Sequence, residues 1–153
     1  MKAARIYTPQ EYLALERKAA YKSEYIGGFI VAMPGVSRWH DRIAGDTYAA
    51  LHAQLADGPC EIFTSDIRVK NEVTGRYTDP DASVVCGEPQ FADEELDTLL
   101  NPTVIIEILS PSTEAYDRGD KFEAYRRLPS LQEYVRIAQN RASVDHFLRQ
   151  GRQ

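Results

Sequence analysis

The sequence predicts one domain of the mixed α/β class, in which helices pack on a β-sheet. Segment 39–56 repeats Ile43, Thr47, Ala50, Leu51 and Gln54 at helical spacing, and segment 114–128 can form a helix with a partly apolar face. Three segments with strand-like apolar patterns, 60–69, 81–86 and 103–109, separate these helices. The 153 residues, 43% hydrophobic and 27% charged, suit a single folded domain over 1–153.

The N-terminal part predicts a short helix and a hairpin. Thr8-Pro9-Gln10-Glu11 has the form of a capping box with proline at the first helical position, which predicts a helix over 9–18. Gly27-Gly28 separates two strand-like segments, 24–26 and 29–33, and this pattern is typical of a β-hairpin.

The remaining elements follow in a simple order. Ser37 can cap the helix over 39–56, which Asp57-Gly58-Pro59 ends. Residues 71–75 predict a turn, and the acidic segment 88–97 predicts an exposed loop with a helical turn. The most apolar strand, 103–109, is expected at the centre of the sheet. Strands are also predicted at 133–138 and 143–148, joined at Asn140-Arg141.

Composition excludes several classes of protein. No apolar run approaches the ~20 residues that span a bilayer, and residues 1–6 lack the apolar stretch of a secretory signal. We therefore expect a cytoplasmic protein without membrane contact. Cys60 and Cys86 fit buried reduced thiols better than a disulfide framework, and they are too few for a cysteine-based metal site.

The charge distribution is uneven along the chain. The net charge of −5 argues against bulk attraction to nucleic acid, but residues 1–117 carry −9 and residues 118–153 carry +4. A basic C-terminal part could meet phosphate while the acidic part holds a divalent cation. An equally supported alternative is that these charges are scattered over the solvated surface and have no binding role.

Glu107 is the residue hardest to explain structurally, because it lies within the apolar strand 103–109. A carboxylate buried there loses hydration worth several kcal/mol unless a cation, a donor or a proton compensates. It could instead face solvent or pair with an arginine such as Arg68. The functional interpretation is a divalent-metal ligand, with Asp81, which opens the strand 81–86, as its partner. Oxygen ligands without cysteine or clustered histidine favour Mg²⁺ or Mn²⁺ over zinc.

Lys121 is the candidate cation of this site. It lies four residues after Asp117, so a surface ion pair is the structural alternative. Tyr125 and Leu128 share its helical face, which tilts Lys121 toward the sheet. The two interpretations are equally supported by these residues alone.

Other polar residues are weaker candidates for a functional site. Glu24 could supply a third carboxylate, although exposed hairpin acids are common. His40, at the start of a helix, could meet a phosphate, but a surface histidine is the simpler interpretation. Residues 110–113 are expected to cap the following helix. A serine hydrolase is excluded because the chain lacks a glycine-flanked nucleophile elbow.

Several motifs in order resemble the Uma-two family, which is endonuclease-like and belongs to the PD-(D/E)xK superfamily. The motifs are Tyr7-Thr8-Pro9, Ser23-Glu24-Tyr25-Ile26, Phe63-Thr64-Ser65-Asp66-Ile67-Arg68, Tyr77-Thr78-Asp79-Pro80-Asp81 and Glu107-Ile108-Leu109-Ser110-Pro111-Ser112-Thr113, followed by Asp117 and Lys121. Together they extend from Tyr7 to Leu148.

The resemblance implies a restriction-endonuclease-like fold with an α-β-β-β-α-β core, preceded here by the N-terminal helix and hairpin. It assigns the two acids to Asp81 and Glu107, and a further acid to Glu24. Leu109 stands where the superfamily's lysine ordinarily lies, so the lysine maps to Lys121. Gly27-Gly28-Phe29 departs from the family's acidic turn, and relatives usually continue beyond Gln153, so a C-terminal segment is expected to be lacking.

The resemblance also implies an activity. It suggests a homodimeric, Mg²⁺- or Mn²⁺-dependent endonuclease that hydrolyses phosphodiester bonds, with DNA as the expected substrate. Asp81, Glu107 and the backbone carbonyl of Ile108 would hold the metal. Lys121 would orient or deprotonate the attacking water, or stabilise the developing charge on the phosphate. The alternatives are a catalytically silent nucleic-acid-binding or regulatory module and a purely structural interaction protein, against which Glu107 counts.

Overall fold

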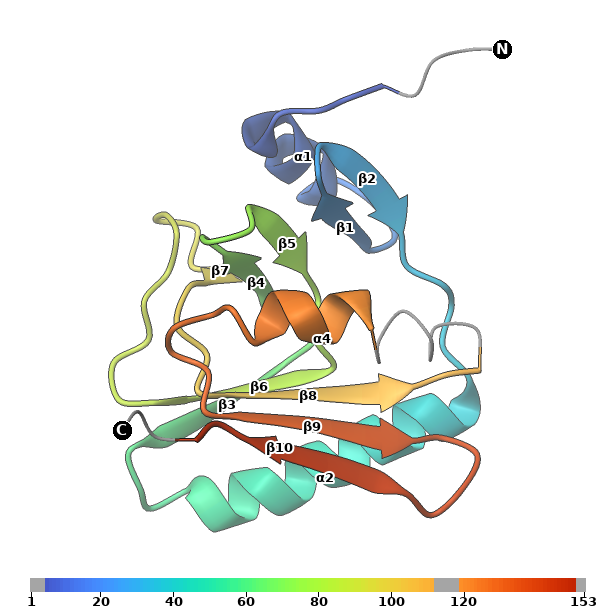
Figure 1. Cartoon of the computed structure of the whole chain (residues 1–153), viewed down its shortest axis with the longest axis vertical. Coiled ribbons are helices and arrows are strands. Elements are labelled where there is room, and N and C mark those ends of the chain that lie inside the picture. The colour runs from blue at the N-terminus through green and yellow to red at the C-terminus, as the bar shows by residue number, and fades with distance from the viewer. Residues whose placement is uncertain (1–4, 112–118, 151–153) are drawn as a thin grey trace.

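The protein, seen here as a computed structural model, is of mixed α/β class and contains two mixed β-sheets (Figure 1). The structure describes residues 5–111 and 119–150. The helices are α1 (Pro9–Glu16), α2 (Arg38–Leu55) and α4 (Asp120–Tyr125). The strands are β1 (Ser23–Ile26), β2 (Phe29–Ala32), β3 (Cys60–Thr64), β4 (Arg68–Asn71), β5 (Arg76–Thr78), β6 (Ala82–Cys86), β7 (Thr98–Leu99), β8 (Val104–Leu109), β9 (Glu133–Ala138) and β10 (Val144–Leu148).

The two sheets have different strand orders. The first sheet runs β2-β1-β5-β4-β7, and the second runs β10-β9-β8-β6-β3. In the second sheet, β8 is central, pairing antiparallel with β6 and parallel with β9. The prediction that strand 103–109 lies at the centre of a sheet is therefore confirmed, whereas the division into two sheets was not predicted.

Local sequence signals account for the N-terminal elements. Thr8 and Glu11 form the reciprocal hydrogen bonds of a capping box at the start of α1. Gly27 and Gly28 both have positive φ, as the tight turn between β1 and β2 requires. A Cβ on Gly28 would lie 2.7 Å from the exposed side chain of Ile6, which would have to shift.

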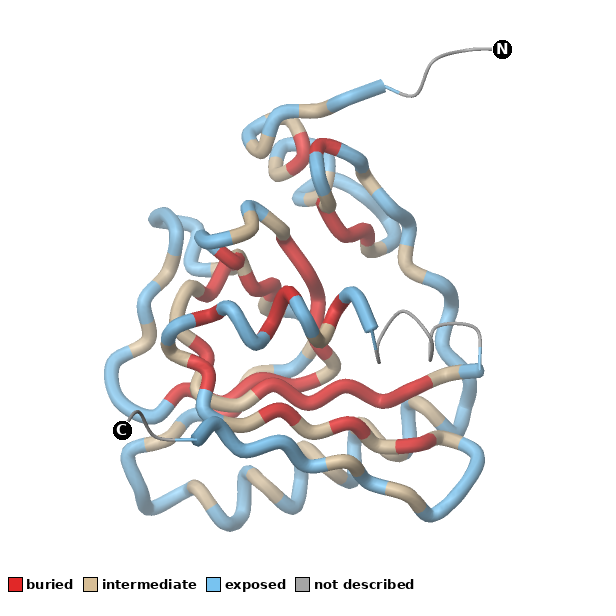
Figure 2. The backbone as a smooth tube through the Cα atoms, viewed as in Figure 1, coloured by how far each residue is buried: buried red, intermediate tan, exposed pale blue. Residues whose placement is uncertain are grey.

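The second sheet separates two layers of the core. Its α2 face carries Ile62, Ala82, Val84 and Ile106, against which Tyr48, Leu51 and Leu55 of α2 pack. Its other face carries Val85 and Ile105, which pack with Tyr125 of α4 and with Val69 and Leu99 of the first sheet. Figure 1 shows α2 and α4 on opposite sides of this sheet, and β8 is buried along most of its length (Figure 2).

The predicted strand over 60–69 differs from the observed structure. The strand expected over 60–69 is divided into β3 and β4 because Ser65 and Asp66 form a turn, in which the Asp66 N–H donates to the Thr64 hydroxyl. The turn over 71–75 is confirmed, since the Gly75 N–H donates to the Asn71 carbonyl, but the strand β5 that follows it was not predicted.

The helix expected over 114–128 and the loop over 88–97 also differ. The α4 helix ends at Tyr125, three residues before the predicted end at Leu128. Leu128 precedes Pro129, a position that disfavours helical geometry. Residues 112–118, including Asp117, lie outside the described residues. The segment 88–97 is largely exposed, as predicted, but it makes turns and a bridge between Phe91 and Leu99 in place of a helical turn.

The expectation of two buried, reduced thiols is wrong. Cys60 and Cys86 form a disulfide between β3 and β6, with Cα atoms 3.9 Å apart. They are directly opposite each other in the strand register, which brings their side chains together. Cys60 is half-buried and Cys86 is exposed.

None of the helices in the described residues is both long and apolar enough to cross a membrane.

Candidate functional site

Four of the charged residues singled out in the sequence, Glu24, Asp81, Glu107 and Lys121, line one cavity of about 460 Å³. The cavity lies where the first sheet, the second sheet and α4 meet, beside the start of α2. Its other lining residues are Val31, Ala32, Met33, Pro34, Gly35, Val36, Ser37, His40, Ile108, Ser110, Pro111 and Gln139. The tertiary structure therefore gathers these four charged residues, which are separated by up to 97 positions, from Glu24 to Lys121, around one space.

Glu107 lies on the α4 face of the central strand β8. Side chains alternate along a strand, so Glu107 shares this face with Ile105, two residues before it. Glu107 is only 3% exposed. Its Oε1 lies 3.1 Å from the Nζ of Lys121 and accepts a hydrogen bond of 3.0 Å from the Tyr125 hydroxyl. Neither solvent exposure nor pairing with Arg68 explains Glu107, because Arg68 pairs with Asp97.

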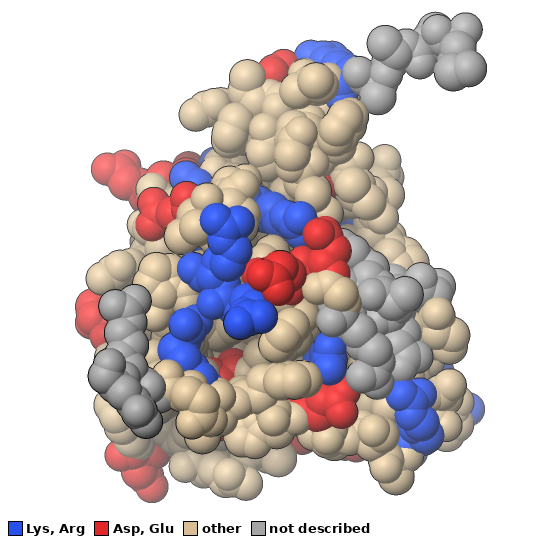
Figure 3. Space-filling model, in the orientation of Figure 1, with Lys and Arg blue, Asp and Glu red and all other residues tan. Residues whose placement is uncertain are grey.

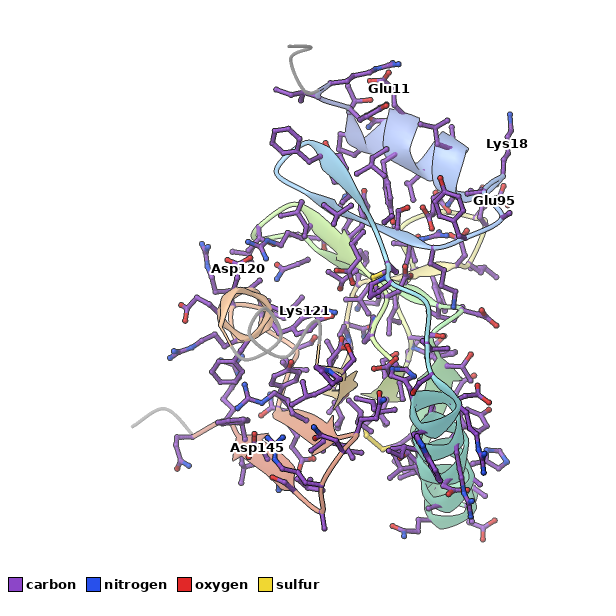
Figure 4. All side chains as sticks on the ribbon, turned by 90° about the vertical axis from the view of Figure 1, so that its right-hand side faces the viewer. Glu11, Lys18, Glu95, Asp120, Lys121 and Asp145 are labelled. Atoms are coloured by element: carbon purple, nitrogen blue, oxygen red, sulfur yellow. A yellow bond between two sulfur atoms is a disulfide. The ribbon has the colours of Figure 1, made fainter. Side chains whose placement is uncertain are left out.

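Lys121 extends from α4 into the molecule. In Figure 4 its side chain points toward the interior, whereas the side chain of the preceding residue, Asp120, points away from it. Asp120 pairs with Arg76, and Lys121 is only 3% exposed. Lys121 is therefore buried rather than on the surface, which its structural alternative assumed; Asp117 lies outside the described residues.

Glu24 reaches the cavity from β1. It is 3% exposed, so the expectation of an exposed hairpin acid is wrong. Its Oε2 lies 3.2 Å from the Lys121 Nζ and accepts a hydrogen bond of 3.1 Å from the Asp79 N–H. Burial and, to a smaller extent, the negative charge of Glu24 together raise the pKa of the Asp79 carboxyl to about 7.

Asp81 directly precedes β6 and lies next to the end of β8. Strand β8 pairs with β6 only over 104–106, and the Ile108 N–H, beyond this stretch, donates a 2.7 Å hydrogen bond to Asp81 Oδ2. The other oxygen, Oδ1, lies 3.1 Å from Nε2 of His40. The Asp81 carboxylate thus contacts groups from the second sheet and from α2.

Two residues of the site were not predicted. A surface histidine is the simpler interpretation of His40 from the sequence, but its side chain is only 13% exposed and contacts Asp81. Tyr125 is fully buried, burial raises the pKa of its phenol well above the usual value, and its hydroxyl lies 2.9 Å from that of Thr78 as well as near Glu107. The spacing of four residues between Lys121 and Tyr125 was the available signal for Tyr125; the sequence offered none for the contact between His40 and Asp81.

The donor set suits a hard divalent cation that keeps part of its hydration shell. Asp81 and Glu107 offer carboxylate oxygens, and Ile108 lines the same cavity. Within the described residues, no three His, Cys, Asp or Glu side chains are grouped closely enough to enclose a metal. Mg²⁺ is commonly bound by one or two carboxylates together with water and substrate phosphate, and two carboxylates fit that mode.

A sequence model of the Uma2 family, described as "Putative restriction endonuclease", matches residues 9–153. The chain belongs to the Uma2 family. The resemblance identified from its motifs is therefore confirmed.

Two proteins from Synechocystis sp. are similar to this Uma2 chain over most of its length. The uncharacterized protein sll1609 is 37% identical over 147 residues, which cover 96% of this chain and 83% of that protein. The uncharacterized protein slr1290 is 38% identical over 140 residues, which cover 92% of this chain and 73% of that protein.

A solved structure shares the fold of this Uma2 chain. It is the crystal structure of a "putative nuclease belonging to DUF820" from Anabaena variabilis, which superposes with a TM-score of 0.69 and covers 92% of this chain and 83% of its own. The sequence identity is 20%, so this likeness bears on the fold alone.

Lys and Arg side chains gather around α4 on one face of the Uma2 chain (Figure 3). Among the basic residues that contact α4 or the segment directly after it, Arg126 pairs with Glu123, Arg76 pairs with Asp120, and Arg149 donates to the carbonyls of Arg126 and Leu128. Both alternatives for the basic C-terminal part therefore stay open, because these contacts stabilise the fold and leave the group on the surface.

Proposed function

We propose that this Uma2 chain is a metal-dependent endonuclease that hydrolyses phosphodiester bonds, with DNA as its substrate. One observation carries the proposal: Glu107 of β8 and Asp81, which directly precedes the neighbouring strand β6, line the same cavity as a buried lysine, Lys121. Apolar residues at these positions would avoid the desolvation of charge, which costs several kcal/mol per buried ion. The charges are therefore best explained by chemistry at this cavity.

The chain order supports a restriction-endonuclease-like core as part of the proposal. Helix α2, strands β3, β6 and β8, helix α4 and strand β9 follow one another as α-β-β-β-α-β, with β4, β5 and β7 belonging to the other sheet. In this interpretation Asp81 and Glu107 are the two acids of the superfamily, and Lys121 replaces the lysine expected at Leu109.

Each residue then has a distinct part in the reaction. Asp81, Glu107 and the carbonyl of Ile108 would hold Mg²⁺ or Mn²⁺. When bound, this ion would supply Lewis-acid polarisation of a phosphate oxygen and a lowered pKa for a nearby water molecule. Lys121, held between Glu24 and Glu107, donates a hydrogen bond to the attacking water or to the phosphate as negative charge develops on it. The attacking water gives up a proton to solvent as its oxygen bonds to phosphorus, the P–O bond to the leaving group breaks, and the leaving oxygen takes up a proton from solvent.

The decisive experiment compares the wild type with Glu107→Gln on single- and double-stranded DNA and RNA. We expect the wild type to cleave DNA in Mg²⁺ or Mn²⁺ and not in EDTA, and Glu107→Gln to cleave at the metal-free level. Glu133→Gln, which changes a more exposed acid on the neighbouring strand β9, serves as the matched control and is expected to retain cleavage.

Binding of nucleic acid by the wild type without cleavage in any metal would support the alternative, a catalytically silent binding module. We also propose a homodimer, which would bring two cutting centres together. Sedimentation that finds only a 17.3 kDa species at high concentration contradicts the dimer.

A further inference from the structure

Both oxygens of the Asp81 carboxylate contact a nitrogen fixed in the fold. Oδ2 accepts from the Ile108 N–H at 2.7 Å, and Oδ1 lies 3.1 Å from His40 Nε2. An ionised carboxylate can only accept hydrogen bonds, so the hydrogen of this contact is on Nε2 of His40. The side chains of His40 and Asp81 are only 13% and 15% exposed, which shields the contact from competing water.

The position of His40 is itself fixed from two directions. Its backbone N–H donates a 3.1 Å hydrogen bond to the hydroxyl of Ser37, the N-cap of α2. The Ser37 hydroxyl also accepts a 2.8 Å hydrogen bond from the Gln139 side chain, which follows β9. The first turn of α2 is thereby tied to the second sheet, and the imidazole is directed at Asp81.

We propose that His40 is a positioning residue that orients the Asp81 carboxylate for metal binding; this inference rests on the proposed function of the cavity. A carboxylate on a short side chain can rotate about two bonds, and a donor on each oxygen removes most of that freedom. The lone pairs of the Asp81 carboxylate that remain available are then oriented toward the cavity before any metal binds. Such partners of metal ligands typically change metal affinity or activity by roughly 10–100-fold when they are removed.

Direct coordination by His40 is the competing role. The contact of Nε2 with Asp81 Oδ1 disfavours it, because the nitrogen that would bind a metal is the one that carries the hydrogen. The described residues also contain no group of three His, Cys, Asp or Glu side chains that could enclose a metal. A metal-bound His40 would have to leave Asp81 first.

The test measures Mn²⁺ affinity of the full chain by electron paramagnetic resonance. We expect His40→Ala to bind Mn²⁺ roughly 10–100-fold more weakly than the wild type. His40→Gln, whose amide nitrogen can reach the place of Nε2, should recover most of that affinity. His52→Ala is the matched control, because His52 is an exposed histidine on the same helix, and it should bind Mn²⁺ like the wild type.

The same samples distinguish positioning from coordination. Spin-echo modulation of bound Mn²⁺ should show no directly coordinated nitrogen in the wild type; a nitrogen signal that is present in the wild type and lost in His40→Gln would overturn the positioning role.

His40→Phe, which keeps the ring volume, replaces His40→Ala if circular dichroism shows that the alanine variant does not fold. Wild-type affinity in a folded His40→Ala or His40→Phe variant overturns this inference and leaves the proposed function standing. A wild type that neither binds Mn²⁺ nor cleaves nucleic acid overturns both.

Discussion

The ammonium of Lys121 lies 3.1 Å from Oε1 of Glu107. It also lies 3.2 Å from Oε2 of Glu24, so a single side chain from α4 joins an acid of the first sheet to an acid of the second. All three side chains are almost fully buried. Because a buried charge left without its partner is strongly destabilising, this lysine has a structural part in the fold as well as its proposed part in catalysis.

Replacing Lys121 should therefore affect both stability and cleavage. We expect Lys121→Met to lower the free energy of unfolding by about 3–5 kcal/mol, since two carboxylates lose their cation. Cleavage per folded molecule should be nearly abolished, while metal binding is retained because Asp81 and Glu107 remain. Urea unfolding, Mn²⁺ titration and a cleavage assay measure the three effects.

The double variant Glu24→Gln/Lys121→Met should be less destabilised than the two single variants combined, because it removes both charges of one pair. Lys18→Met, at an exposed position, is the control and should match the wild type. A folded Lys121→Met protein with wild-type cleavage would contradict the proposed role of the lysine.

Tyr125 should contribute to stability through its hydroxyl. Tyr125→Phe removes a donor to Glu107 and a hydrogen-bond partner of Thr78, both of which are buried. We expect a loss of about 1–3 kcal/mol in the free energy of unfolding, because buried polar groups lose a partner. Urea unfolding of Tyr125→Phe beside Tyr21→Phe, which changes an exposed tyrosine, measures this difference. Equal stability of the two variants would argue against the observed hydrogen bonds.

Asp97 predicts a specific dependence of stability on pH. Hydrogen bonds from Arg17, assisted by Arg68, hold the pKa of the Asp97 carboxyl well below its usual value of 3.8. The folded state therefore favours ionised Asp97, and this stabilisation is fully present above pH ~4 and is lost as the pH falls below that value.

We expect Asp97→Asn to lower the free energy of unfolding by about 1.5–3 kcal/mol at pH 7, the range for hydrogen bonds to a charged group. The difference from the wild type should shrink as the pH falls from 4 toward 2. Urea unfolding over this range checks it, with the exposed acid variant Asp57→Asn as control. A difference that does not change with pH would show that the ionised state of Asp97 is not what stabilises the fold.

The disulfide should stabilise the protein without taking part in the site. Cys60 and Cys86 close a loop with a sequence separation of 26 residues, for which a loss of roughly 2–4 kcal/mol is expected on removal. Cys86 ends β6, whereas Asp81 precedes its first residue, so the two lie at opposite ends of the strand. Thermal unfolding with and without reductant, compared with Cys60→Ala/Cys86→Ala, measures the contribution.

Cleavage by the folded double variant should equal that of the wild type. A loss of cleavage without a loss of folding would show that the disulfide influences the cavity through β6.

Local patterns in the sequence correctly indicated the elements whose geometry depends on a few neighbouring residues. The capping box of Thr8 and Glu11, the paired glycines of the first hairpin and the Ser37 cap all act through short-range hydrogen bonds or φ restriction. The apolar strand around Glu107 was equally clear, because hydrophobic periodicity is a property of the segment itself. From these features the mixed α/β class and the pair of candidate acids, Asp81 and Glu107, could be predicted. The segment around Lys121 supported two interpretations equally, and the family resemblance assigned this lysine to the site.

The partners of those residues depended on the tertiary structure. Strand register and packing join segments that are distant in the chain. They account for the two sheets in place of one, the disulfide between facing cysteines and the burial of Glu24. The contact between His40 and Asp81 likewise exists only because α2 begins beside the start of β6. The sequence by itself determined which residues could carry charge into the core; the packing of α2 and α4 on the sheets decided which of those charges meet, because contacts over such separations form only when the whole chain folds.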